Sequence, residues 1–204
     1  MIADRLLKQH PIISSQVDRD ELAVVLRECE KTLSAIPGDV VELGCYVGTT
    51  SLFLARMLQA QASERRLYLY DSFAGLPEKV PEDDSPAGLQ FQQGELAASK
   101  KDLIKRFRQE GLSLPTIKKA WFSELTAGDM PPRIAFAFLD GDYYESIRDS
   151  LRLVWPRLSA GGCIVVDDYV NEALPGARRA VDGWLKDHPA AITATKSLAI
   201  IRNR

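Results

Sequence analysis

Carboxylate side chains follow two apolar segments of this sequence, and their spacing suits chemistry on a cation. The run "GGCIVVDDYVN" leads four apolar residues, Cys163 to Val166, directly into Asp167 and Asp168. The run "IAFAFLDGDYYES" leads a second apolar segment into Asp140 and Asp142, which stand on either side of a glycine. Carboxylates close to a protein core repel one another and lose hydration, so a positive charge should compensate them.

A divalent metal ion is the compensating charge that this residue chemistry favours. The four aspartates offer hard oxygen ligands, and no cysteine pair or histidine cluster accompanies them. Mg²⁺ is therefore expected, with Ca²⁺ or Mn²⁺ as alternatives. The competing interpretation is that Asp142 or Asp168 only caps the helix that follows it.

A second candidate site is carried by the segment "VVELGCYVGTTS". Gly44 and Gly48 give a GxxxG spacing after a strand, whereas a dinucleotide fingerprint needs GxGxxG and a close approach of the backbone. Tyr46 blocks that approach, so a ligand without phosphates, S-adenosylmethionine (SAM), fits better. Glu42 can face its ammonium group, and Asp71 can accept from both ribose hydroxyls. Otherwise, Gly44 makes a turn and Glu42 is solvated.

These residues need a scaffold, and the alternation of apolar segments predicts one. Strands are expected at 39–44, 66–71, 116–121, 134–140 and 163–168, and two more in "AITAT" and "LAIIR". Helices are expected at 18–36, 49–60, 101–111, 144–158 and 177–188. The pattern predicts an α/β fold with a mostly parallel sheet, helices on both faces and an antiparallel last strand. Ligands bind such sheets beyond the carboxyl ends of the strands, where all these acids are expected to meet.

Bulk composition limits the classes of function. The chain has 204 residues and a net charge of −2, which provides no electrostatic basis for binding nucleic acid or an anionic membrane. It shows no signal peptide and no segment of membrane-spanning length. Its three cysteines stand singly, which disfavours zinc and suits a reducing cytoplasm.

Five motifs, in order, resemble a known family. "VVELGCYVGTTS", "YDSFAGLP", "AWFSEL", "FLDGDYYES" and "PRLSAGGCIVVDDY" are similar to the macrocin O-methyltransferase (TylF/MycF-like) family of class I methyltransferases. The resemblance covers about residues 38–185. It implies a Rossmann-like class I methyltransferase domain that uses SAM and Mg²⁺ to methylate a hydroxyl, typically on a sugar of a natural product.

The resemblance also assigns roles to individual residues. It places the cofactor beside Glu42, Gly44, Tyr46, Gly48, Ser51, Asp71, Ser72 and Asp140, with Trp121, Phe122 and Ser123 near the adenine. It matches Asp140, Asp167 and Asp168 to the metal ligands, and Asp142 to the general base.

Several features extend or limit this prediction. Residues 1–37 are expected to be a helical segment before a methyltransferase domain at 38–204, and family members usually carry a longer N-terminal region. The loop 72–95 is a candidate lid or else a disordered insertion.

Other functions stay open. A catechol-type phenol could replace the sugar as acceptor, and the domain could be catalytically silent. An NAD-dependent oxidoreductase is disfavoured by Tyr46. The partner is a small hydroxyl acceptor, and a homodimer stays open.

Overall fold

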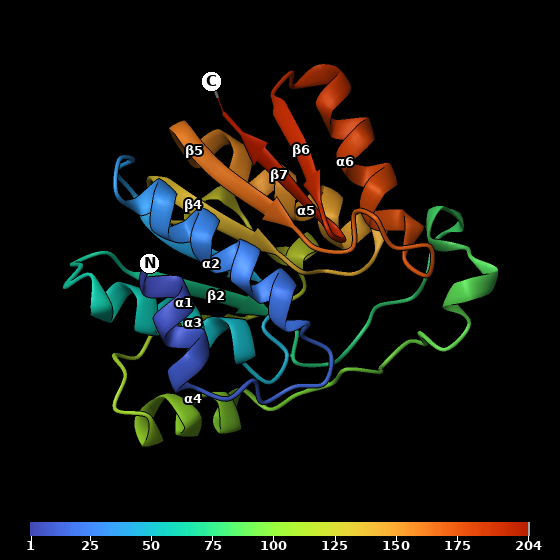
Figure 1. Cartoon of the computed structure of the whole chain (residues 1–204). Coiled ribbons are helices and arrows are strands. Elements are labelled where there is room, and N and C mark those ends of the chain that lie inside the picture. The colour runs from blue at the N-terminus through green and yellow to red at the C-terminus, as the bar shows by residue number, and fades with distance from the viewer. Residues whose placement is uncertain (204) are drawn as a thin grey trace.

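A central sheet with helices on both faces forms the molecule in a computed structural model that describes residues 1–203 (Figure 1). The strands are β1 (Asp39–Leu43), β2 (Leu67–Asp71), β3 (Thr116–Lys119), β4 (Ile134–Leu139), β5 (Leu158–Val166), β6 (Ala191–Thr195) and β7 (Leu198–Arg202). The helices are α1 (Ile2–Gln9), α2 (Arg19–Leu33), α3 (Thr49–Ala60), α4 (Lys100–Gln109), α5 (Tyr144–Val154) and α6 (Pro175–Asp187).

The strand order confirms the predicted fold class. The order is β3-β2-β1-β4-β5-β7-β6 in a seven-stranded sheet. Strands β1 to β5 pair in parallel, and β7 pairs antiparallel with both β5 and β6. The carboxyl ends of the five parallel strands therefore lie at one edge of the sheet, as the acid-ending strands required.

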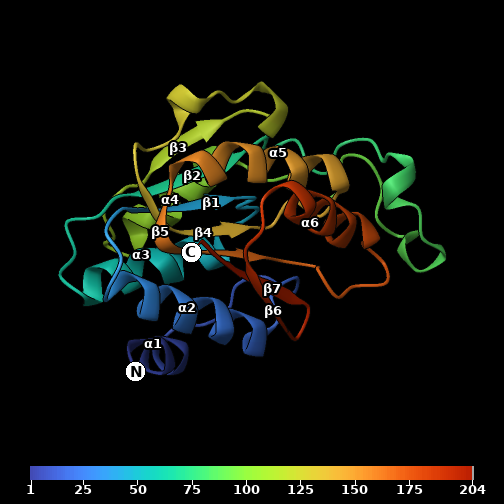
Figure 2. The ribbon, with the colours of Figure 1, turned by 90° about the horizontal axis from the view of Figure 1, so that it is seen from above.

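Two apolar cores form on the two faces of the sheet, which accounts for its nearly continuous apolar strands. The first core joins one sheet face to α1, α2, α3 and α4, with Leu26, Phe53 and Phe107 among its buried side chains. The second joins the opposite face to α5 and α6, with Ile147 and Val181 buried. Seen from above, α1 to α3 lie on one side of the sheet and α5 with α6 on the other (Figure 2).

Some element bounds differ from the sequence prediction. The helix expected to reach residue 158 ends at Val154, because Pro156 has no backbone N–H and the chain continues as a 3₁₀ turn, Trp155–Arg157. Strand β5 then begins at Leu158, earlier than expected. Within residues 1–37, which were expected to be helical, only the helix at 18–36 was delimited from the sequence. The structure also has the short helix α1, whose buried residues are few and whose first backbone N–H groups are capped by the distant Glu30 carboxylate.

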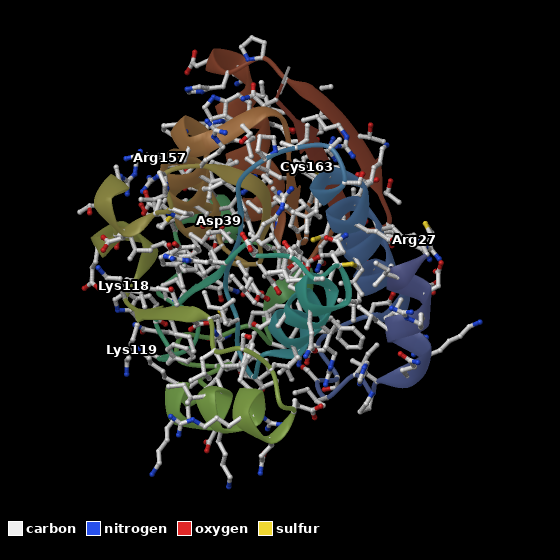
Figure 3. All side chains as sticks on the ribbon, turned by 90° about the vertical axis from the view of Figure 1, so that its left-hand side faces the viewer. Arg27, Asp39, Lys118, Lys119, Arg157 and Cys163 are labelled. Atoms are coloured by element: carbon white, nitrogen blue, oxygen red, sulfur yellow. The ribbon has the colours of Figure 1, made fainter. Side chains whose placement is uncertain are left out.

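One edge of the sheet, strand β3, carries positive charge. Lys118 and Lys119 lie on the edge strand β3, and Figure 3 shows both at the outside of the molecule. Lysine on an edge strand discourages pairing with another chain.

Within residues 1–203, no helix combines the length and apolar character needed to cross a membrane.

Candidate functional site

One cavity of about 670 Å³ lies beyond the carboxyl ends of the parallel strands. It is lined by most of the residues singled out from the sequence: Glu42, Gly44, Tyr46, Asp71, Ser72, Trp121, Phe122, Asp140, Asp142, Asp167 and Asp168. The glycine-containing segment and the aspartate cluster thus share a single space. Three predicted cofactor residues, Gly48, Ser51 and Ser123, are not part of the lining.

The turn after β1 depends on two glycines. Gly44 has a φ of 94°, and a Cβ there would lie 1.8 Å from the backbone oxygen of Asp140. Any side chain would therefore push apart the ends of β1 and β4, which carry the two halves of the site. Gly48 has a φ of 89° and precedes the first residue of α3. Tyr46, between them, also has a positive φ of 46°, which is uncommon for a residue with a side chain.

Asp71, at the end of β2, organises this turn. Its Oδ2 accepts hydrogen bonds from the backbone N–H groups of Cys45 (2.7 Å) and Tyr46 (3.0 Å). Its Oδ1 accepts from the N–H of Phe73 at 2.6 Å. The sequence suggested a ribose ligand for this carboxylate but not its three backbone partners. Asp71 therefore holds the β1 turn in place and faces the cavity as well.

Glu42 lies within β1 and is only 1% exposed. Ser51 of α3 donates its hydroxyl to Oε2 of Glu42 at 2.5 Å, so Ser51 contacts the site through Glu42 and does not line the cavity itself. Burial raises the pKa of Glu42 from its usual 4.5 to about 8, although the Ser51 hydrogen bond opposes this shift. A buried carboxyl facing the cavity is a ready partner for a cationic ligand group.

Three aspartates form a compact oxygen cluster at the ends of β4 and β5. One carboxylate oxygen each from Asp140, Asp142 and Asp168 lies within 4.8 Å of the others. Asp142 and Asp168 have positive φ values of 59° and 57°, so the backbone at both positions adopts a conformation that L-residues rarely take. Backbone strain of this kind clusters at active sites and ligand-binding sites.

The pKa values of the cluster reflect crowding. Burial raises the pKa of Asp140 first, and the neighbouring carboxylates of Asp167, Asp142 and Asp168 raise it further. Burial, followed by the charges of Asp168 and Asp167, likewise raises the pKa of Asp142. These carboxylates oppose one another's ionisation, so a cation placed among them would be bound strongly.

Asp167 is near this cluster, but its carboxylate oxygens are not part of the compact group. Both of its hydrogen bonds fall on Oδ1, from the N–H of Asp168 at 2.9 Å and the hydroxyl of Ser197 at 3.3 Å. Asp168 accepts at Oδ1 from the Asn171 side chain at 2.7 Å. The structure therefore groups Asp142, and not Asp167, with the predicted ligands Asp140 and Asp168.

Residues that the sequence did not single out close the cavity. Segment 12–19, which leads into α2, lines it, together with Phe91, Leu96, Leu174 and Ser197. Asp18 caps α2, because its Oδ1 accepts from the N–H groups of Asp20 and Glu21. Glu21 does not complete a capping box with Asp18, because its carboxylate accepts from Ser197 instead. No local motif could have indicated these long-range contacts.

The loop after β2 is ordered and covers one side of the site. It contains two 3₁₀ turns, Pro81–Asp83 and Pro86–Gly88, and appears in green at the right of Figure 1. Asp83 is 2% exposed, and its Oδ1 accepts from the N–H of Tyr144 at the start of α5, at 2.7 Å. Tyr143 packs beneath the loop and donates its hydroxyl to the carbonyl of Phe91 at 3.2 Å. The structure therefore disfavours the disordered-insertion alternative.

Comparison with known proteins identifies relatives of this chain. The family described as Macrocin-O-methyltransferase (TylF) matches residues 15–197. The 8-demethyl-8-(2,3-dimethoxy-alpha-L-rhamnosyl)-tetracenomycin-C 4'-O-methyltransferase of Streptomyces olivaceus is 35% identical over 156 residues, 72% of this chain and 60% of the relative. The mycinamicin III 3''-O-methyltransferase of Micromonospora griseorubida is 30% identical over 162 residues, 75% of this chain and 62% of the relative.

A solved structure agrees with the sequence relatives. The structure of the O-methyltransferase NovP superposes with a TM-score of 0.78 at 26% identity, covering 93% of this chain and 81% of that one. The chain spans about three-fifths of the length of the curated relatives that it matches. The family model matches most of the chain, and the sheet order and the five motifs agree with it, so the chain belongs to the macrocin O-methyltransferase (TylF) family.

Proposed function

We propose that this protein is an O-methyltransferase that moves the methyl group of SAM to one hydroxyl of a vicinal diol, with Mg²⁺, on a sugar of a natural product. The observation that carries this proposal is the single cavity shared by Glu42 and Asp71 at one end and the aspartate cluster at the other. A methyl donor and a hydroxyl acceptor must meet in one enclosed space for the transfer to occur.

The cofactor end of the cavity suits SAM. The buried Glu42 would accept from the ammonium group, and the lone pair of Asp71 Oδ1 that Phe73 leaves free would accept from a ribose hydroxyl. Trp121 and Phe122 also line the cavity and would lie beside the adenine. When bound, SAM supplies an electrophilic methyl group on its sulfonium. The chain's own part is to orient this group toward the acceptor and exclude water.

The aspartate end suits a divalent ion. The clustered oxygens of Asp140, Asp142 and Asp168 are hard ligands, and their raised pKa values show how unfavourable the uncompensated cluster is. We assign Asp140, Asp167 and Asp168 to the ion, as the family resemblance implies; Asp167 would contribute the oxygen left without a hydrogen bond. When bound, Mg²⁺ would lower the pKa of an acceptor hydroxyl.

Asp142 is the residue proposed to take the proton. It follows Asp140 across a glycine and opens toward the cavity at the turn that leads into α5. Burial is the first cause of its raised pKa and would persist when a cation offsets the charges of Asp168 and Asp167, and a raised pKa favours accepting a proton. Its place in the compact cluster makes a ligand role the specific alternative.

The acceptor is proposed from the relatives, whose names describe methylation of a rhamnosyl-bearing tetracenomycin and of mycinamicin III. A catechol offers two neighbouring hydroxyls as well, so it stays the second acceptor to be tested. We also propose a cytoplasmic location, because Cys29, Cys45 and Cys163 are free and buried.

Turnover measurements test the proposal directly. The purified protein is incubated with SAM and Mg²⁺ and a panel of glycosides with vicinal diols, and product S-adenosylhomocysteine and methylated acceptor are quantified by mass spectrometry. A matched panel replaces each diol by its single-hydroxyl analogue, and a catechol series runs in parallel. We expect turnover on diol glycosides that a chelator abolishes. Undiminished turnover in chelator would contradict the metal mechanism, and preference for catechols would change the acceptor class.

A further inference from the structure

The turn between β6 and β7 lies beside the aspartate cluster because of the sheet topology. Strand β7 runs antiparallel to β5, and Val166 pairs with Ala199. The start of β7 therefore adjoins the end of β5, where Asp167 follows. This places Ser197 next to Asp167, although 30 residues separate them in the sequence.

Ser197 is held tightly by a second carboxylate. Its hydroxyl lies 2.6 Å from Oε1 of Glu21, and its backbone N–H donates to the same oxygen at 3.2 Å. On its other side, the hydroxyl lies 3.3 Å from Oδ1 of Asp167. One hydroxyl thus stands between two carboxylates from distant parts of the chain, and its single proton can be donated to only one of them at a time.

The contacts of Asp167 give this hydroxyl a directing role. The Asp168 N–H and the Ser197 hydroxyl can both donate to Oδ1 of Asp167, and together they set the rotation of the Asp167 carboxylate. A carboxylate held at one oxygen presents its other oxygen in a fixed orientation. Hydrogen bonds that orient metal ligands in this way commonly change metal affinity by about 10–100-fold when they are removed.

We propose that Ser197 is a positioning residue for the metal site: with its backbone N–H held by Glu21, its hydroxyl donates to Oδ1 of Asp167 and orients that carboxylate when the site holds an ion. This inference rests on the proposed metal-dependent function. A role confined to closing the hairpin would not need the hydroxyl. The β6–β7 ladder and the hydrogen bond from the Val170 N–H to the Ser197 carbonyl, at 2.9 Å, are made by backbone groups alone.

The test measures metal binding and not only catalysis. Mn²⁺ is titrated into the full chain and followed by calorimetry and by the electron paramagnetic resonance signal of free Mn²⁺. Ser197→Ala should raise the Kd for Mn²⁺ by about tenfold, with the melting temperature and the Kd for SAM unchanged. Ser197→Thr keeps a hydroxyl and should restore most of the affinity.

A matched control comes from the neighbouring residue. Lys196 lies in the same turn, and its ammonium pairs at 3.1 Å with the Asp20 carboxylate, away from Asp167. Lys196→Gln should therefore leave the Kd for Mn²⁺ unchanged. An unaltered Kd in Ser197→Ala, or a parallel loss of SAM affinity and melting temperature, would overturn the positioning role alone. Failure of the unaltered protein to bind Mn²⁺ would overturn the proposed metal site and this inference with it.

Discussion

Asp71 illustrates how much of a residue's role its type and position can indicate. Its location at the end of an apolar strand predicted a carboxylate at the sheet edge, and the structure places it there. Its hydrogen bonds to the N–H groups of Cys45, Tyr46 and Phe73 were not predicted, because they depend on how two strand ends meet. Residue type thus indicated the chemistry, whereas the partners required the fold.

Substitution of Glu42 by glutamine should raise the thermal stability of the protein and lower its affinity for SAM. Its pKa is about 8 in the folded protein and near 4.5 when unfolded, so both states hold the proton below pH 4.5. As pH rises toward 8, only the unfolded state releases it, and the folded state loses relative stability. Glu42→Gln removes this penalty while keeping an acceptor for Ser51. We expect the variant to melt above the unaltered protein at pH 8 by about 2–4 °C per kcal/mol recovered, with a smaller difference at pH 5.

The same variant should bind SAM more weakly, because the ammonium group loses its charged partner. A loss of about 1–3 kcal/mol is expected from calorimetry. Ser51→Ala serves as the matched control, since it removes the hydroxyl but leaves the carboxyl. Equal melting differences at pH 5 and pH 8, or unchanged SAM affinity, would show that Glu42 does not have this role.

Asp142 can be distinguished as proton acceptor or ligand by one substitution. Asp142→Asn should lower kcat by about 10²–10⁴-fold, the usual contribution of a general base, and leave the Kd for Mn²⁺ nearly unchanged. The loss should shrink at high pH, where hydroxide can accept the proton. Asp140→Asn is the comparison, because there metal affinity itself should fall. A large rise in the Mn²⁺ Kd of Asp142→Asn would make Asp142 a ligand, in agreement with its place in the compact cluster.

At the scale of elements, the loop between β2 and α4 shows how a long connection becomes fixed. Asp83 binds the N–H of Tyr144, and the Ser85 hydroxyl donates to the Glu172 carbonyl at 2.5 Å. Gly88 approaches the chain so closely that a Cβ would lie 2.1 Å from the Ala173 carbonyl oxygen. The loop is therefore attached to α5 and to the segment before α6. Its composition alone could not decide between this docking and disorder.

Removing the Asp83 carboxylate should release this loop. Asp83→Ala leaves the N–H groups of Tyr144 and Val80 without their acceptor, at a cost of about 1–3 kcal/mol. Trypsin should then cleave after Lys79 faster than in the unaltered protein, and the KM for the acceptor should rise. Asp84→Ala, at the exposed neighbouring position, is the control for charge alone. Equal cleavage rates in the two variants would show that Asp83 does not hold the loop.

At the scale of the whole molecule, the sheet could be predicted and the closure of the cavity could not. Apolar strands that end in acids predicted a parallel sheet with its site at one edge, because strand ends follow from local pattern and parallel pairing. The contact between Glu21 and Ser197 joins residues 176 positions apart, and no periodicity encodes it. The bounds of helix α1 within the expected helical segment could not be given for a similar reason, since the helix is short and is capped by Glu30 of α2.

The charge of the whole cavity predicts which form of the acceptor this protein uses. Its lining includes the acids Asp18, Glu21, Glu42, Asp71, Asp140, Asp142, Asp167 and Asp168, whereas Arg19 is the single basic residue of the lining in the described chain. Even with several of these acids protonated, a diphosphate would meet few cationic partners, and recognition of phosphate normally relies on them.

We therefore expect an uncharged glycoside to be methylated with a kcat/KM at least about tenfold above that of the nucleoside diphosphate of the same sugar, because like-charge contacts cost several kcal/mol. Raising the ionic strength should narrow this ratio, since salt screens the exposed part of the repulsion. The measurement compares initial rates on the two forms of one sugar at matched Mg²⁺. Equal kcat/KM values would show that charge does not select the acceptor. The expected ratio would place methylation after the glycosyl transfer that joins the sugar to its aglycone.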